Sequence, residues 1–143
     1  MIEITKEFCF EGAHSLMGYD GKCCHIHGHS YKLYVTVEGN PISDTTSPKN
    51  GMILDFTDLK KIVSQNIISV YDHALVLNEK SPLAQQICDA YGNTIITQFQ
   101  PTCENLVAHF AEIINNRLPE GIRLKRVKLF ETATSSAEWI NNG

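Results

Sequence analysis

The stretch that decides the fold is His27-Gly28-His29-Ser30-Tyr31-Lys32-Leu33-Tyr34-Val35-Thr36-Val37-Glu38. From Tyr31 onward, apolar side chains occupy every second position, a pattern typical of a β-strand with one buried face. Gly39 and the polar segment 40–50 end the run in a loop. We therefore predict a strand from near His27 to Glu38, with His27 and His29 on the same face.

Three further segments have strand character. Residues 3–11 alternate between polar and apolar, although Lys6 interrupts the apolar face. Strand character returns over 122–131 and, more weakly, over 137–141. Together with the opening stretch, these segments predict a sheet whose first two strands lie at the N-terminal end of the chain and whose last two lie at the C-terminal end.

Between the strand pairs the period changes to that of a helix. Apolar residues recur at helical spacing over 59–70, and Asp55 or Thr57 is placed to cap the start of this helix. A second amphipathic helix follows Thr102, its predicted cap, and ends before Pro119. Both helices are amphipathic, so we expect each to pack its apolar face on the sheet.

The order strand, strand, helix, helix, strand, strand predicts an α+β fold (ββααββ), with two helices on one face of a four-stranded antiparallel sheet. Residues 1–143 are enough for one domain. The secondary structure of residues 79–100 is left undecided: 82–90 fits a short helix and 95–99 fits an extended segment. Open sheet edges and the long apolar run Tyr31–Val37 favour closure through a homo-oligomer.

Composition excludes several classes of protein. The net charge is −4 and no long basic run occurs, which argues against nucleic-acid binding. The charged N-terminus and the lack of a long apolar stretch argue against a signal peptide or membrane span, so we expect a cytoplasmic protein. The five cysteines are odd in number, so we expect reduced thiols.

The histidines form the strongest functional signal. Three of the six fall in Cys23-Cys24-His25-Ile26-His27-Gly28-His29, and His14 follows the first predicted strand. His27 and His29 can share one ion, and His14 becomes the third ligand if the first two strands pair in antiparallel fashion. Three histidines with an open fourth position are typical of catalytic zinc. His25 is the alternative third ligand, and a cysteine as fourth ligand would make the site structural.

Six motifs then occur in one order along nearly the whole chain. They are Phe10-Glu11-Gly12-Ala13-His14, Gly21-Lys22-Cys23 with His27-Gly28-His29-Ser30-Tyr31, Gly51-Met52-Ile53-Leu54-Asp55-Phe56-Thr57-Asp58-Leu59-Lys60, Asp72-His73 with Leu77-Asn78, Pro101-Thr102-Cys103-Glu104-Asn105, and Glu131-Thr132. This set resembles the 6-pyruvoyl-tetrahydropterin synthase and 6-carboxy-tetrahydropterin synthase superfamily. Each motif is weak alone, and their common order carries the resemblance.

The resemblance implies a single catalytic domain with a zinc site formed by His14, His27 and His29. It also implies a catalytic Cys23, a helper His73 oriented by Asp72, and a pterin-recognising carboxylate at Glu131. The implied architecture is the tunnelling fold, whose subunits join their sheets into a barrel. Active sites at subunit contacts and hexamers are common in that superfamily, so we expect a hexamer.

Several substrate contacts can be expected from side-chain chemistry. Glu131 can accept the amino group and the adjacent ring N–H of a pterin side by side. Thr102 and Glu104 are first a helix cap and a first-turn acid, with substrate contact second. A triphosphate needs cations, for which Lys22, Lys49 or residues of a neighbouring subunit are candidates.

The spacing between motifs indicates the branch of the superfamily. Three residues separate Cys23 from His27, as in the bacterial carboxy-forming branch that the chain resembles, whereas pyruvoyl-forming enzymes carry a longer insert. We therefore expect a lyase that converts 7,8-dihydroneopterin triphosphate to 6-carboxy-5,6,7,8-tetrahydropterin with loss of acetaldehyde and triphosphate, on the path to queuosine. The pyruvoyl-forming reaction and a non-catalytic zinc or pterin-binding module are the alternatives.

The chain departs from the superfamily pattern at two cysteines. Cys24 stands beside Cys23, and Cys103 occupies a place where a small hydroxyl residue is usual. The reactive form of a cysteine is the thiolate, which a nearby metal ion or imidazolium favours. Cys24 therefore leaves the identity of the catalytic thiol open.

Overall fold

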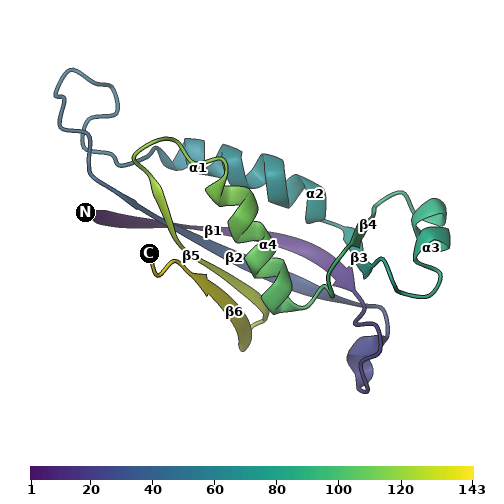
Figure 1. The fold of residues 1–143 in the computed structure, drawn as a ribbon. Coiled ribbons are helices and arrows are strands. Elements are labelled where there is room, and N and C mark those ends of the chain that lie inside the picture. The colour runs from purple at the N-terminus through teal and green to yellow at the C-terminus, as the bar shows by residue number, and fades with distance from the viewer.

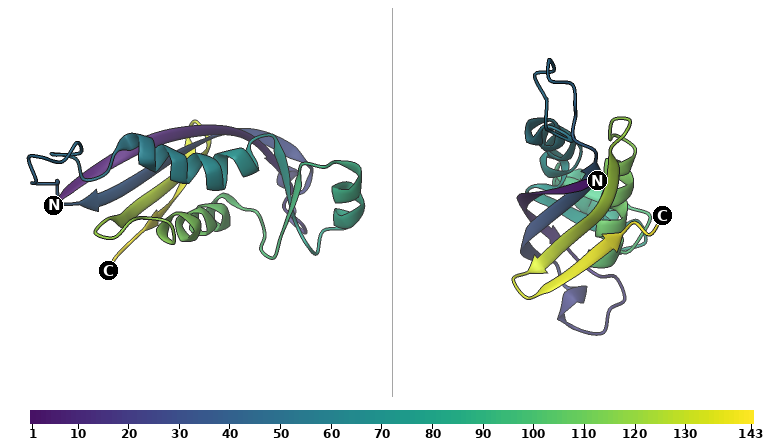
Figure 2. Two further views of the ribbon diagram at one scale, coloured as in Figure 1. Left: turned by 90° about the horizontal axis from the view of Figure 1, so that it is seen from above. Right: turned by 90° about the vertical axis from the view of Figure 1, so that its left-hand side faces the viewer.

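The computed structural model describes residues 1–143 and shows a curled sheet with its two long helical segments on one face (Figures 1 and 2). The strands are β1 (Ile2–His14), β2 (His27–Gly39), β3 (Ala74–Asn78), β4 (Thr94–Thr97), β5 (Arg123–Thr132) and β6 (Ser135–Ile140). The helical elements are η1 (Lys22–Cys24), α1 (Phe56–Val63), η2 (Ser64–Ile68), α2 (Ser69–Tyr71), α3 (Ala84–Ala90) and α4 (Cys103–Asn115). The predicted α+β class is thereby confirmed.

The sheet is larger than the sequence predicts. Its strand order is β4-β3-β1-β2-β5-β6, so the prediction of four strands is wrong. The antiparallel pairs β1–β2, β2–β5 and β5–β6 form as expected. However, β3 lies parallel to β1 and β4 parallel to β3, so the sheet is mixed rather than wholly antiparallel.

The two extra strands are short. β3 has 5 residues and β4 has 4, too few to show a period that separates a strand from a turn of helix. β3 follows α2 directly and continues in the direction of that helix, which brings it alongside the end of β1 in parallel orientation (Figure 1). α3 then connects β3 to β4, so both elements that the sequence left open over residues 79–100 form.

The helices bury the face of the sheet that carries the apolar alternation. Leu33, Val35 and Val37 of β2 are fully buried, as the alternation predicts. The continuous helical segment of α1, η2 and α2 contributes Leu59, Val63 and Ile67 to the same core, and α4 contributes Leu106, Phe110 and Ile114. One hydrophobic core therefore fixes both long helical segments against the sheet.

Both predicted helix caps are present. The Asp55 carboxylate accepts a hydrogen bond from the Thr57 backbone N–H at 2.8 Å, which decides between the two candidate caps of α1. The Thr102 hydroxyl accepts from the Asn105 backbone N–H at 3.1 Å at the start of α4. These caps set where each helix begins, and α4 consequently begins beside the end of β1.

The apolar run Tyr31–Val37 is not a sheet edge. β2 pairs with β1 on one side and with β5 on the other, which makes it a central strand whose apolar side chains face the core. The edges are β4 and β6. No helix in the structure has the length and apolar content that crossing a membrane would require.

Replacing Leu33 by alanine should lower the free energy of unfolding by about 3 kcal/mol, because it leaves a cavity under both long helical segments. Urea denaturation measures the change. Lys32→Ala, at the adjacent exposed position of β2, is the control and should stay within about 0.5 kcal/mol of the parent. Equal losses in the two variants would contradict the assigned faces of β2.

Candidate metal centre

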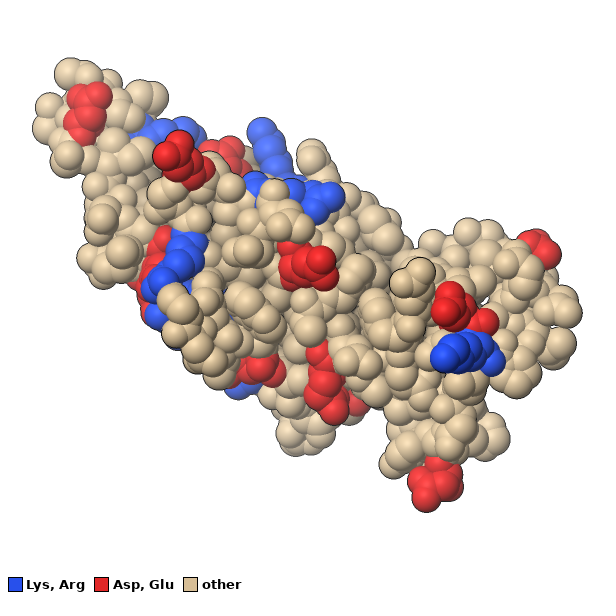
Figure 3. Space-filling model, viewed as in Figure 1, with Lys and Arg blue, Asp and Glu red and all other residues tan.

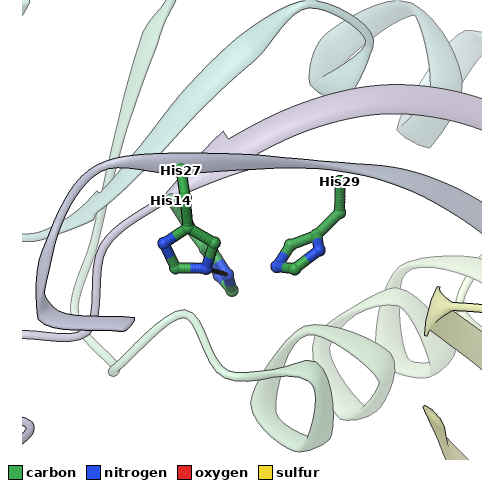
Figure 4. A group of neighbouring side chains, drawn as sticks. All are labelled: His14, His27 and His29. Atoms are coloured by element: carbon green, nitrogen blue, oxygen red, sulfur yellow. Dashed lines mark hydrogen bonds between the residues drawn. The ribbon is translucent and has the colours of Figure 1, made fainter. Parts of the chain in front are cut away.

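Strand pairing brings three histidines together at one end of the sheet (Figure 4). In the β1–β2 register, His14 lies opposite His27, and Gly12 lies opposite His29. All three imidazoles point to the same face, and their ligand atoms lie within 4.8 Å of one another. The predicted triad is therefore assembled by the antiparallel pair, as the sequence indicates.

Two backbone carbonyls fix how two of the rings are protonated. His14 Nδ1 lies 2.7 Å from the Pro101 carbonyl oxygen, and His27 Nδ1 lies 2.7 Å from the His25 carbonyl oxygen. A carbonyl oxygen only accepts, so each Nδ1 carries the proton and donates. In the neutral rings both Nε2 atoms then hold lone pairs, and these atoms face each other at 3.0 Å. Two facing lone pairs repel each other unless a proton or a metal ion lies between them.

The third ring fits the same ion. His29 Nε2 is buried and has no hydrogen-bond partner. Ligand nitrogens at the usual zinc distance and tetrahedral angles lie about 3.3 Å apart, close to the spacing of His14 Nε2 and His27 Nε2. The three Nε2 atoms therefore fit a divalent ion such as zinc, and His25, whose side chain is exposed, contributes only its carbonyl.

Burial keeps the rings available as ligands. Burial lowers the pKa of His14 below its ordinary value, partly offset by the Pro101 hydrogen bond and the Glu131 carboxylate. Burial likewise lowers the pKa of His29, again with Glu131 opposing the change. A neutral imidazole is the form that binds a metal ion, so the surroundings favour metal binding at neutral pH.

Glu131 lies among the same side chains. Its Oε1 is 3.4 Å from His14 Nε2 and 3.6 Å from His29 Nε2. β5 alternates in and out, which puts Glu131 on the face that carries buried Leu129. The structure thus brings the predicted pterin-recognising carboxylate to the histidine cluster.

Tyr31 and Cys103, to which the sequence analysis assigned no role in the site, pack against this region. Tyr31 lies beneath the rings, with its centroid 5.6 Å from that of His29, and burial raises the pKa of its hydroxyl. Burial, together with Glu131, raises the pKa of Cys103 to about 11, and its thiol donates to the Leu129 carbonyl. Cys103 is therefore a neutral packing residue.

Cys23 lies on η1 within the loop between β1 and β2. Its carbonyl accepts from the Leu16 backbone N–H at 2.8 Å, which closes the loop. The side-chain amide of Gln100 forms two hydrogen bonds with the backbone of Met17, the residue after Leu16. Its Oε1 accepts from Met17 N at 3.2 Å, and its Nε2 donates to Met17 O at 2.7 Å. Gln100 thereby ties the loop that carries Cys23 to the segment just before α4.

Asp72 and His73 form a pair between α2 and β3. Asp72 accepts from the Glu11 backbone N–H at 2.9 Å, and a second oxygen lies 3.1 Å from His73 Nδ1. These contacts lower the pKa of Asp72, the Glu11 hydrogen bond most of all. His73 is 76% exposed, adopts φ 61°, and lines a cavity of about 840 Å³ with Glu11 and Ser30. No hydrogen bond or ion pair joins this pair to the histidine triad of its own protomer.

The remaining predicted site residues lie either near the histidine triad or at the opposite end of the sheet. Thr102 and Glu104 lie on the first turn of α4, directly after the Pro101 that binds His14. Lys22 precedes Cys23 on η1. Lys49, in contrast, lies in the loop after Gly39, at the opposite end of the β1–β2 pair, where it forms an ion pair with Asp55. Acidic and basic side chains are interspersed on the face of the molecule seen in Figure 3.

Fold and geometry together define an α+β protein with a three-histidine site that can hold a divalent metal ion. The chain belongs to the 6-pyruvoyl tetrahydropterin synthase family, whose family model matches residues 3–141. Membership makes it a pterin synthase of lyase type. The sequence-based identification of the superfamily is thus confirmed.

Individual relatives support this assignment. A 6-carboxy-5,6,7,8-tetrahydropterin synthase of Haemophilus influenzae is 37% identical over 145 residues, which covers 97% of this chain and 99% of the relative. A crystal structure of an uncharacterized protein from Wolinella succinogenes superposes with a TM-score of 0.80 at 22% identity, covering 99% and 98% of the two chains. The 6-pyruvoyl tetrahydropterin synthase of Caenorhabditis elegans gives 0.69 at 22% identity, covering 99% and 96%. These likenesses confirm that the single chain has the fold of a tunnelling-fold subunit.

Mild acid should destabilise the metal-free protein. The folded pKa values of His14 and His29 are lowered from 6.5, so just below that pH the unfolded chain binds more protons, and the free energy of unfolding falls as the pH falls. Melting temperatures between about pH 7.5 and 5.5 measure the slope. The carboxyl groups whose pKa values are lowered, those of Glu38, Asp55 and Asp72, change the free energy of unfolding only at lower pH. A His14→Gln, His29→Gln double variant should lose most of the slope, and an unchanged slope would contradict this account.

Removing the Gln100 amide should loosen the cysteine loop. Gln100→Ala deletes both hydrogen bonds to Met17, so amide hydrogen exchange over residues 15–26 should become at least several-fold faster. Gln98→Ala is the control, because the Gln98 side chain is exposed and makes no hydrogen bond. Equal exchange in the two variants would show that Gln100 does not hold the loop.

Proposed function

We propose that the protein is a zinc-dependent 6-carboxy-5,6,7,8-tetrahydropterin synthase. In this reaction 7,8-dihydroneopterin triphosphate and water give 6-carboxy-5,6,7,8-tetrahydropterin, acetaldehyde and triphosphate. The observation that carries the proposal is the approach of His14 Nε2 and His27 Nε2 to 3.0 Å, with His29 Nε2 unpartnered beside them. Family membership and the Haemophilus relative support the pterin substrate.

The site residues divide the chemistry among them. When bound, zinc acts as a Lewis acid that stabilises negative charge developing on substrate oxygens. We assign Cys23 as the base that takes a proton from the substrate side chain, since its loop is tied to the segment that also orients His14. We assign Glu131 to the amino and ring N–H groups of the pterin. Thr102 and Glu104, on the adjacent first turn of α4, would contact the substrate beside it.

The helper pair requires a second protomer. His73 is exposed, and no hydrogen bond or ion pair joins it to the triad of its own chain, although Asp72 orients it. We therefore propose a homo-oligomer, with a hexamer favoured, in which sheets join into a barrel and His73 of one copy serves the site of another. The free edges β4 and β6 support such pairing.

The triphosphate lies, in this proposal, near Lys22. This lysine is exposed and precedes Cys23 at the end of the sheet that carries the triad. Lys49 is at the other end and is already paired with Asp55, so we do not assign it to the substrate of its own protomer. We place the reaction in queuosine biosynthesis in the cytoplasm, an assignment that the motif resemblance supports.

Product analysis tests the reaction. Zinc-loaded protein incubated with 7,8-dihydroneopterin triphosphate should release acetaldehyde and triphosphate and form the 6-carboxy product, identified by mass. A chelator should abolish turnover and added zinc should restore it. Triphosphate release without acetaldehyde would instead establish the pyruvoyl-forming reaction, and zinc binding without turnover would establish a binding module.

Cysteine variants test the base. Cys23→Ala should lower kcat by at least about a hundredfold while zinc stays bound, because the general base is lost and the imidazoles are untouched. Cys9→Ala, an exposed cysteine on the other face of β1, is the control and should retain activity. Cys24→Ala decides between the adjacent thiols: loss of activity there, with Cys23→Ala active, would transfer the role to Cys24.

A further inference from the structure

The side chains of two neighbouring residues, Asp72 and His73, contact each other, which an extended chain does not allow. Successive side chains of an extended chain point to opposite sides, yet Asp72 Oδ2 lies 3.1 Å from His73 Nδ1. His73 departs from the extended chain, because its φ of 61° lies in the left-handed region that a residue with a β-carbon rarely occupies. The arrangement of the pair therefore depends on what holds the His73 backbone in that region.

Hydrogen bonds engage both polar groups of the His73 backbone. Its N–H donates to the Glu11 carbonyl at 2.5 Å. Its carbonyl accepts from Asn93 Nδ2 at 2.5 Å, and the same nitrogen also donates to the Asp72 carbonyl at 3.4 Å. The Asn93 backbone carbonyl in turn accepts from the Leu75 N–H at 3.0 Å. One residue of the turn between α3 and β4 thus binds three peptide groups around the start of β3.

The side-chain amide of Asn93 offsets the cost of the left-handed backbone. That cost, at a residue with a β-carbon, and the net contribution of one hydrogen bond to stability are of similar size. Loss of the Asn93 donor would consequently let His73 leave the left-handed region. Alanine in place of Asn93 has no donor, and aspartate would put an oxygen atom against the His73 carbonyl.

We propose that Asn93 is a positioning residue that keeps His73 in the left-handed conformation and its imidazole on the Asp72 carboxylate. An ionised carboxylate only accepts, so this pairing keeps a proton on Nδ1. In the neutral ring the Nε2 lone pair is then left for the cavity that His73 and Asn93 both line. Asn93 acts on the backbone of His73 and not on a substrate. The consequence for catalysis rests on the proposed function, whereas the backbone contacts do not.

Nuclear magnetic resonance of the full chain tests the positioning without turnover. The variants are Asn93→Ala, which removes the donor, Asn93→Asp, which keeps the size of the side chain, and Thr94→Val as the matched control. Thr94→Val deletes another hydrogen bond of the same turn, from the Thr94 hydroxyl to the Tyr91 carbonyl at 2.8 Å. The observables are the amide exchange rates of His73 and Leu75 and the distribution of the His73 imidazole proton between Nδ1 and Nε2.

Both Asn93 variants should speed amide exchange at His73 by at least about threefold and move the imidazole proton from Nδ1 toward Nε2. Exchange at Leu75 should stay at the parent rate, because the Asn93 backbone carbonyl is retained. Thr94→Val should match the parent at both residues. Parent-like exchange and protonation of His73 in Asn93→Ala would overturn the inference, as would equal changes in Thr94→Val.

Steady-state kinetics of the zinc-loaded protein connect this contact to the proposed reaction. Asn93→Ala should lower kcat about tenfold with little change in KM, because it displaces a proton-transfer group and leaves the residues assigned to substrate binding in place. In a His73→Gln background the same substitution should have no further effect. An unchanged kcat in Asn93→Ala, or an equal loss with and without His73, would overturn the positioning role. A parent protein without turnover would refute only the proposed reaction, since the resonance measurements decide the backbone contact.

Discussion

The rest of the site depends on two carbonyl oxygens that orient two imidazoles. The backbone carbonyls of Pro101 and His25 each accept a hydrogen bond from an Nδ1 atom, which turns the opposite nitrogens of His14 and His27 toward each other. Solvent has little access to the Pro101 contact, since His14 is buried, whereas the contact between His25 and His27 is exposed. The fold therefore selects the Nδ1–H tautomer of His14 and His27 and leaves the Nε2 atoms free to bind a metal ion.

One short segment serves both halves of the proposed chemistry. Pro101 holds His14, the preceding Gln100 grips the loop of Cys23, and the following Thr102 caps α4. The Asn105 side chain also donates to the Gln100 carbonyl, which ties the segment to the first turn of the helix. A displacement of α4 would consequently move His14 and the loop of Cys23 together. The position of one relative to the other would then change little.

Side-chain period predicted the central strands and placed His27 and His29 on one face, while the third ligand stayed open between His14 and His25. The alternation in β2 and the adjacent His14 indicate which histidines can converge, because strand geometry has a period of two. β3 and β4 were not predicted as strands, since segments of 5 and 4 residues carry no readable period. The Pro101 carbonyl carries no side-chain signature, and the Gln100 amide acts on a backbone distant in sequence. Glu131 was predicted as a pterin ligand, but its approach to the rings depends on the pairing of β5 with β2.

His73 combines an unfavourable backbone torsion with an exposed side chain. A residue with a β-carbon at φ 61° is strained by about 1 kcal/mol, which glycine at that place would avoid. The strain turns an imidazole outward, where it contributes almost nothing to packing within its own subunit. A glycine substitution at this position would relieve the torsional strain and remove the imidazole to which we assign a role in the proposed shared site, so durability and activity would be traded at a single backbone torsion.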